Sequence, residues 1–165
     1  MLARTIQRFS TVARRGYAAA AAAPAKNANP EELRLTFASP DTAFFSNEVV
    51  KQVDVPTLAG VVGVLANHVP TIGVLKPGVV QVTKSDGNVE RVFVSSGTLS
   101  VNIDGSCQVL AEEVVKIEDI DESVARAELD AAQRQSGEGS EAARAEAQIR
   151  AEVAEALIKA ATNQQ

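Results

Sequence analysis

Hydrophobic and polar residues alternate along the first two thirds of the chain. The period of two is typical of half-buried strands. Runs of β-branched and aromatic residues, Val79–Val82 and Val92–Val94, point the same way. The alternation is carried by Leu33, Leu35 and Phe37, by Leu99, Val101 and Ile103, and by Cys107, Val109 and Ala111. We expect eight to ten short strands between Leu33 and about Ile117, arranged as an antiparallel sandwich or barrel.

Residues typical of turns separate these predicted strands. Asp86-Gly87 and Asp104-Gly105 each separate two apolar runs. Both pairs predict hairpins with type I′ turns, whose central residues need positive φ. Lys76-Pro77-Gly78 predicts a type II turn, because proline fixes φ and glycine supplies the positive one.

The pattern changes to a helical one after Asp121. Alanine accounts for 13 of residues 122–161. Asp119 or Asp121 can cap a first helix and Ser140 a second, with a break at 137–139. Four acid-before-base pairs have the i, i+4 spacing of neighbours on a helix: Glu122–Arg126, Asp130–Arg134, Glu146–Arg150 and Glu155–Lys159. The predicted fold is therefore α+β: an N-terminal antiparallel β-sandwich over residues 31–118, a C-terminal antiparallel two-helix hairpin over 119–161, and a short tail at 162–165.

The apolar positions of the predicted hairpin are mostly alanines, which bury little area. Such a hairpin should be marginal alone and gain stability by docking on the sandwich or on a partner; the alternative is a self-sufficient, solvated hairpin. The residues expected to pack are Ala125, Leu129 and Ala132 in the first helix and Ala143, Ala147, Ala151, Ala154 and Ile158 in the second.

The first 17 residues have the composition of a mitochondrial transit peptide. Leu2, Ile6 and Phe9 would share one helical face, with arginines roughly opposite and no acidic residue before Glu31. Cleavage is expected near Tyr17, followed by a small-residue linker at 18–30. A basic disordered tail is the alternative.

Composition excludes several functional classes. The chain holds one histidine, His68, and one cysteine, Cys107, so a multi-histidine or cysteine-built metal site is excluded and no catalytic group is expected. Its 16 basic and 21 acidic residues become 12 and 21, a net charge of −9, without the four arginines of residues 1–17. An acidic body and 4% aromatic residues argue against nucleic acid as a partner. No apolar run reaches the length of a transmembrane helix.

The segment from Leu58 to Val80 is strongly apolar, yet glycines and prolines interrupt it. We interpret it as short strands joined by tight turns, with residues 67–70 exposed at one end. His68 lies within it without a second histidine or a nearby cysteine, so an interface or structural role is favoured over metal binding or a pH switch.

Five motifs occur in a fixed order along the chain. They are Val53-Asp54-Val55-Pro56, Gly60-x-x-Gly63-Val64-Leu65-x-x-His68-Val69-Pro70, Leu75-x-Pro77-Gly78, Phe93-Val94-Ser95-Ser96-Gly97 and Leu110-Ala111-Glu112-Glu113. Together they resemble one known family, the mitochondrial delta subunits of F-type ATP synthases, counterparts of the bacterial and chloroplast epsilon subunits. The resemblance covers about residues 31–161, and the glycine–histidine–proline segment is its most specific part.

The resemblance implies a non-catalytic part of the central stalk, without a cofactor. Such a subunit binds the gamma subunit, the ring of c subunits and a small mitochondrial epsilon subunit, and links proton-driven rotation of the ring to ATP synthesis. It would be peripheral to the inner membrane on the matrix side and not a homo-oligomer. The alternative is a stand-alone matrix β-sandwich that binds a ligand or regulates another protein.

Two further expectations concern particular residues. The resemblance implies two interface segments at the end of the sandwich that faces the ring of c subunits. The first segment consists of Leu58, Ala59 and Gly60, and the second of Asn67, His68, Val69 and Pro70. Some bacterial relatives bind ATP through Ile/Leu-Asp-x-x-Arg-Ala. Here four residues separate Asp121 from Arg126, which rotates Arg126 by about 200° on a helix and argues against nucleotide binding.

Overall fold

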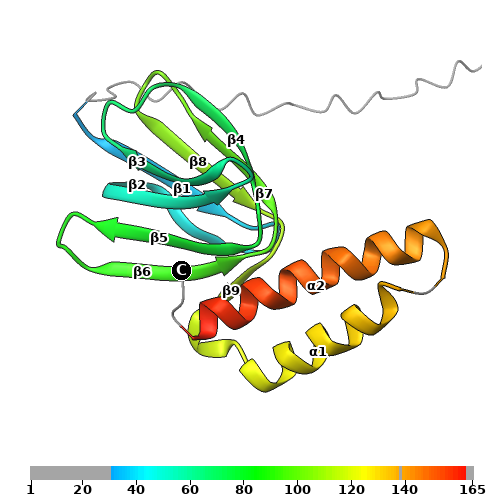
Figure 1. Cartoon of the computed structure of the whole chain (residues 1–165). Coiled ribbons are helices and arrows are strands. Elements are labelled where there is room, and N and C mark those ends of the chain that lie inside the picture. Colours follow the sequence, from blue (N-terminus) through cyan, green and yellow to red (C-terminus); the bar gives the residue numbers. More distant parts are fainter. Residues whose placement is uncertain (1–30, 138, 163–165) are drawn as a thin grey trace, which may run out of the picture.

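The computed structural model describes residues 31–137 and 139–162. The predicted transit peptide, the linker at 18–30 and all but the first residue of the predicted tail lie outside these residues. The predicted succession of strands and helices is confirmed (Figure 1). In chain order the elements are β1 Leu33–Ala38, β2 Ala43–Thr57, β3 Gly60–Leu65, β4 Thr71–Leu75, β5 Gly78–Lys84, β6 Val89–Val94, β7 Gly97–Val101, β8 Ser106–Ala111, β9 Val114–Lys116, the 3-10 turn η1 Ile117–Asp119, α1 Glu122–Gln135 and α2 Glu141–Ala161.

The strands form a sandwich whose two layers share the long strand β2. The first half of β2 pairs with β1, and the layer continues through β8 and β7 to β4. Its second half pairs with β3 on one side and β5 on the other, and this layer continues through β6 to β9. Every pairing is antiparallel except β1 with β8, which is parallel. Strand β4 also pairs with the end of β2, at Leu75 and Thr57, so β3 and β4 flank the end of β2.

The core lies between the two layers and consists of inward-facing aliphatic and aromatic side chains. The alternation predicted for β1 and β8 is confirmed, because Leu33, Leu35 and Phe37 are buried, as are Cys107, Val109 and Ala111. The alternation in β7 ends at Val101. Ile103 is 92% exposed in the turn that follows, so its predicted place in a strand is wrong.

Both Asp-Gly pairs form hairpin turns, but not of the predicted type I′. Only the glycines, Gly87 and Gly105, have positive φ; Asp86 and Asp104 do not. The Gly87 amide donates to the Lys84 carbonyl and the Gly105 amide to the Asn102 carbonyl. This pattern fits a type I turn closed by a left-handed glycine, the usual three-residue hairpin loop.

Gly78 is also not the turn residue that the sequence predicts. It has no positive φ and begins strand β5. A Cβ at this position would lie 3.0 Å from the Pro56 Cβ. Glycine is therefore required here by close packing against β2 and not by a type II turn.

The helices begin and end where the sequence predicts. The Asp121 carboxylate accepts from the amides of Ser123 and Val124, and the Ser140 hydroxyl accepts from the Ala143 amide. Of the four predicted pairs, Glu122–Arg126 forms an ion pair and the Arg134 side chain donates to the Asp130 carbonyl instead of its carboxylate. The stretch from Glu112 to Asp121 contains five acidic residues and connects the sandwich to α1 through β9 and η1.

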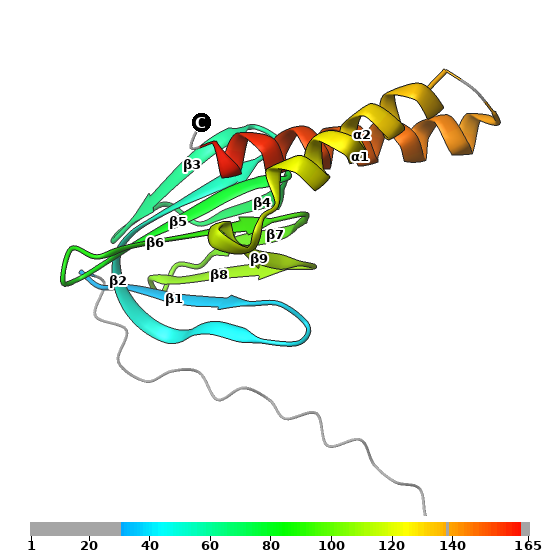
Figure 2. The same cartoon turned by 90° about the horizontal axis from the view of Figure 1, so that it is seen from below.

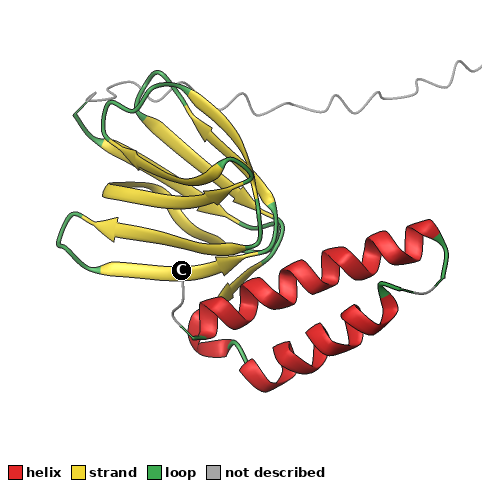
Figure 3. Ribbon diagram, in the orientation of Figure 1, coloured by secondary structure: helices red, strands yellow, loops and turns green. Residues whose placement is uncertain are grey.

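Helix α2 packs on the outer face of the layer that contains β5 and β6. Phe93 of β6 is 3% exposed although it lies outside the core cluster, and its register partner Val79 is half-buried. The elements that contact this layer are α2, against β5, and η1, against β6. Figures 1 and 3 show α2 between the sandwich and α1, and Figure 2 shows the hairpin turn pointing away from the sandwich.

Candidate functional site

One side of the sandwich exposes a concentration of large apolar side chains. All belong to β3, β4 and the loops at the two ends of β3, and each is between 49% and 86% exposed. We call this region the β3–β4 surface; its members are Leu58, Val61, Leu65, Val69, Ile72 and Val74. Large exposed apolar patches on soluble proteins mark interaction sites.

The local sequence explains why these side chains face outward. In β3, Val64 is buried while Val61 and Leu65 are exposed, as the strand period of two requires. In β4, Ile72 and Val74 face outward while Leu75 is buried. Both faces of these strands are apolar, so alternation cannot be seen in the residue types.

Hydrogen bonds tie the turn between β2 and β3 to strand β4. The Leu58 amide donates to the Val74 carbonyl, and the Thr57 hydroxyl donates to the Gly60 carbonyl at 2.7 Å. Gly60, with φ of 120°, closes the turn between β2 and β3. The turn is thereby fixed to β4 as well as to β2.

The outer face beside β4 is uncharged as well. Ile72 pairs with Ser100 and Val74 with Thr98 of β7, and Thr98 pairs with the half-exposed Leu110 of β8. Aliphatic and hydroxyl side chains therefore continue from β4 onto β7 and β8. A partner could cover this face without desolvating a charge.

The two predicted interface segments do not share one end of the sandwich. Leu58, Ala59 and Gly60 precede or begin β3, whereas residues 67–70 follow its last residue, Leu65. The prediction of a single end is therefore wrong, since six residues of extended strand separate them. Both segments are nevertheless parts of the β3–β4 surface, through Leu58 and Val69.

His68 lies in a tight turn that Asn67 makes possible. The His68 amide donates to the Leu65 carbonyl, and Asn67 adopts a φ of 61°, which asparagine tolerates better than most residues. The His68 ring nitrogen Nδ1 is 2.9 Å from the Val69 carbonyl oxygen. The ring is half-buried beside the exposed Val69 and Pro70, a position that suits an interface residue.

The hairpin alanines divide into buried and exposed positions. Ala125 and Ala132 of α1 and Ala147 and Ala154 of α2 are at most 5% exposed. Leu129, Ala151 and Ile158 are half-buried, whereas Ala143 is exposed beside the hairpin turn. Ala160, which the sequence did not single out, is also buried.

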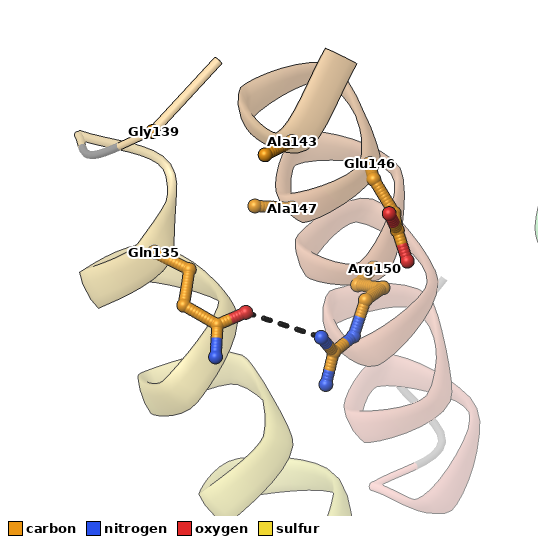
Figure 4. A pocket seen from close by; sticks show the side chains of 6 residues that line it. All are labelled: Gln135, Gly139, Ala143, Glu146, Ala147 and Arg150. Atoms are coloured by element: carbon orange, nitrogen blue, oxygen red, sulfur yellow. Dashed lines mark hydrogen bonds between the residues drawn. The ribbon is translucent and has the colours of Figure 1, made fainter. Parts of the chain in front are cut away.

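An ionic clasp joins the two helices. Arg150 was expected to pair with Glu146 of its own helix, but its guanidinium forms an ion pair with Glu128 of α1 instead. It also donates to the Gln135 side-chain oxygen at 3.1 Å, as Figure 4 shows. Beside the clasp lies a crevice of about 350 Å³, into which Ala143 and Ala147 face.

The surroundings of Cys107 and Arg126 indicate structural roles for both residues. Cys107 is buried in the core, and burial raises the pKa of its thiol to about 12. A thiol with that pKa is not a nucleophile at neutral pH. Arg126, the arginine compared with the bacterial ATP motif, forms its ion pair with Glu122 on the same helix.

Sequence reasoning missed four members of the β3–β4 surface: Val61, Leu65, Ile72 and Val74. One signal could have indicated them. The 18 residues from Leu58 to Leu75 contain no Asp, Glu, Lys or Arg. Exposed strands whose own residues include no charged side chain are candidates for an interface.

Comparison with known proteins gives a consistent result. Residues 32–117 match the family "ATP synthase, Delta/Epsilon chain, beta-sandwich domain". The chain is 87% identical to the mitochondrial ATP synthase subunit delta of Caenorhabditis elegans over the full length of both. It is 40% identical to the subunit of that name from Yarrowia lipolytica, covering 88% of this chain and 86% of the relative.

Solved structures agree with these relatives. A chain of the Euglena gracilis mitochondrial ATP synthase structure, which contains OSCP, F1 and the c-ring, superposes with a TM-score of 0.72 and 30% identity over 78% of this chain and 80% of the other. The comparisons do not favour the alternative of a stand-alone ligand-binding module. Three findings lead to one conclusion: the sandwich matches the family over residues 32–117, a helical hairpin follows it, and one relative matches the chain over the full length of both. The chain belongs to the family of ATP synthase delta and epsilon chains.

Proposed function

We propose that the chain is a non-catalytic rotor part of the mitochondrial ATP synthase, on the matrix side of the inner membrane. The observation that carries the proposal is the β3–β4 surface, with its six exposed apolar side chains and no charge from Leu58 to Leu75. Burying one such side chain contributes about 1.5–3 kcal/mol. A subunit that transmits torque needs this kind of tight, extensive contact.

Within this proposal, the two strands face different neighbours. Strand β3 lies lengthwise along the c-ring, so that the segments at its two ends, Leu58–Gly60 and Asn67–Pro70, both reach the ring. Strand β4 and the hydroxyl-rich face of β7 meet the gamma subunit. The close-packed sandwich between them resists shear.

Cysteine crosslinking in the assembled enzyme tests the assignment. Cys107 is 0% exposed, so an introduced surface cysteine would be the one that reacts. Ala59→Cys and Asn67→Cys should both form crosslinks with c subunit, and Ile72→Cys with gamma. The matched control is Ile103→Cys, a fully exposed apolar position outside the β3–β4 surface. Equal crosslinking to c subunit from position 103 would contradict the assignment.

The hairpin has a separate role in the proposal: its outer surface binds the small epsilon subunit. The buried alanines hold the two helices close enough to present that surface. Ala147→Glu would place a carboxylate at a position that is 2% exposed and so loosen both hairpin and assembly. Ala143→Glu, on the exposed position one turn earlier, is the control. Retention of the epsilon subunit by Ala147→Glu at the level of Ala143→Glu would count against this role.

A further inference from the structure

The two Asp-Gly turns of the sandwich are capable of a covalent reaction that the proposed function does not use. In Asp86-Gly87 and in Asp104-Gly105, the main-chain nitrogen of the glycine can attack the side-chain carboxyl of the aspartate before it. Glycine has no side chain to obstruct this approach. The attack closes a five-membered succinimide ring, which water then opens at either of its two carbonyl carbons.

The reaction needs only water and leaves the mass of the chain unchanged. The bond between the glycine nitrogen and the aspartate Cγ forms while the neutral carboxyl loses its hydroxyl, which departs with the amide proton as water. Hydrolysis returns one water molecule. If it breaks the new bond, aspartate is restored; if it breaks the original peptide bond, isoaspartate remains. In isoaspartate the main chain runs through the side-chain carbons and is one atom longer.

Both turns hold the reacting groups in the same way. The Asp86 carboxylate accepts from the Asn88 amide at 2.9 Å, and the Asp104 carboxylate accepts from the Ser106 amide at 3.0 Å. The ring that each of these bonds closes contains the aspartate Cγ and the glycine nitrogen. The glycine amide of each turn is also hydrogen-bonded, to a carbonyl two residues before the aspartate. Within the turns themselves, the two sites are therefore matched.

Each turn must open before it reacts. Hydrogen bonds from Asn88 lower the pKa of the Asp86 carboxyl, and those from Ser106 lower the pKa of the Asp104 carboxyl, so both groups are ionised at neutral pH. Only the neutral carboxyl can lose its hydroxyl as water, and the glycine nitrogen must first leave its own hydrogen bond. The rate at each site therefore depends on the free energy of opening that turn locally.

The turn between β7 and β8 is held by the start of β1. The Arg34 amide donates to the Gly105 carbonyl at 3.2 Å, and a Cβ at Gly105 would lie 3.1 Å from the Glu32 carbonyl oxygen. The Ser106 hydroxyl adds a bond to the Asp104 carboxylate at 2.6 Å. Opening this turn therefore breaks contacts with β1 as well as the bonds of the turn.

The turn between β5 and β6 has no comparable hold on its glycine. Residues 85–88 are exposed, and nothing beyond the chain neighbours of Gly87 lies within 4 Å of the place its Cβ would take. The Ser85 hydroxyl donates to the Val49 carbonyl of β2, but at 3.3 Å. Figure 1 shows this turn projecting from the sandwich on the side away from the helices. It can open without disturbing the core, and its main chain has room for one more atom.

We propose that Asp86-Gly87 is a site of isoaspartate formation and that Asp104-Gly105, its chemical match in the same chain, resists the reaction. The tip of the β5–β6 hairpin is then the place where this chain changes covalently with age. The inference does not rest on the proposed function, because it depends only on the two turns and on what holds them.

Ageing of the purified full chain at neutral pH and physiological temperature tests the proposal. Mass spectrometry with electron-transfer fragmentation distinguishes isoaspartate from aspartate and gives the isoaspartate fraction at each site. Position 86 should gain isoaspartate at least about fivefold faster than position 104. In concentrated urea, where neither turn is held, the same two positions should react at similar rates. Equal rates in the folded chain, a faster rate at position 104, or isoaspartate in urea only would each overturn the proposal.

Three variants test the cause of the difference. Asp86→Glu should abolish the signal at position 86, because its longer side chain would have to close a six-membered ring. Asn88→Ala removes the side-chain bond to the Asp86 carboxylate at 2.7 Å and should raise the rate at position 86 alone by about two- to fivefold. Ser106→Ala should do the same at position 104 alone. If neither alanine variant changes its own site, the hydrogen bonds of the turns do not control the reaction and the explanation is wrong.

Discussion

Gly97, at the start of β7, shows how tightly one residue can constrain the sandwich. It has a φ of 148°, and a Cβ there would overlap the Leu110 carbonyl oxygen and lie 2.8 Å from the Ala111 Cα. Since those atoms belong to the backbone of β8, they cannot move aside. Gly97→Ala should lower the free energy of unfolding by about 2–4 kcal/mol in denaturant titrations. Gly137→Ala, where nothing lies within 4 Å, is the control; equal effects of the two would refute the steric argument.

Asp121 gives the start of α1 a pH dependence. Hydrogen bonds from the Ser123 hydroxyl and from the amides of Val124 and Ser123 hold the pKa of its carboxyl below the usual 3.8. A lowered folded-state pKa means that the cap stabilises the helix above pH 3.8 and is lost as the pH falls through the folded-state value. Amide hydrogen exchange of Ser123 and Val124, corrected for intrinsic rates, should therefore accelerate below about pH 4.

A neutral capping residue separates this titration from general acid denaturation. Asp121→Asn keeps an oxygen acceptor at the N-cap and removes the titrating group. In this variant, the exchange rates at Ser123 and Val124 should change with pH in the same way as those of the core amides of β8, throughout the acid range. If the variant loses protection of α1 at the same pH as the parent chain, titration of Asp121 is not the cause.

Between elements, the clasp formed by Arg150 is the polar contact that aligns the hairpin. Its guanidinium Nε donates to the Glu128 carboxylate at 2.8 Å, and Nη1 donates to Gln135. Both Arg150 and Glu128 are partly exposed, so solvent screens the pair. Arg150→Met should reduce the stability of the hairpin by about 0.5–1.5 kcal/mol in thermal unfolding followed by far-UV circular dichroism.

The control distinguishes pairing across the hairpin from pairing along α2. Glu146→Gln should change little, because Arg150 turns toward Glu128 and not toward Glu146. Glu128→Gln should cost about as much as Arg150→Met, and the double variant no more than either alone. Additive losses would show that Arg150 and Glu128 act independently.

The success of sequence reasoning differed between elements for physical reasons. In β1, one face meets the core and the other meets water, so the alternating positions of Leu33, Leu35 and Phe37 identify the strand in the sequence. The capping residues of the helical hairpin and the break between its two helices can likewise be recognised in the sequence. In β3 and β4 both faces are apolar, and only the pairing of β3 with β2 and of β4 with β7 decides which side chains are buried.

At the scale of the molecule, the sequence indicated where the site lies along the chain but not its shape. The segment from Leu58 to Val80 is unusual in its sequence, and its glycine–histidine–proline part is the most specific part of the family resemblance. That its two predicted segments lie at opposite ends of β3 depends on strand register, which is set by contacts distant in sequence. How α2 docks against the layer that contains β5 also depends on contacts distant in sequence, and no local pattern encodes it.

The exposed β3–β4 surface should make the chain dependent on its partners for solubility. Apolar surface that is covered in the complex is available for self-association when the chain is alone. The segment from Leu58 to Leu75 contains neither Lys nor Glu, the residues that commonly protect such a strand from association with another chain. Replacing Val61, Ile72 and Val74 by Thr should shift the isolated chain toward monomer in analytical ultracentrifugation and leave its circular dichroism spectrum unchanged. The same triple variant should enter the assembled enzyme less efficiently. Ile103→Thr, which removes an exposed apolar residue elsewhere, should do neither; if it restores the monomer equally well, self-association does not depend on the β3–β4 surface.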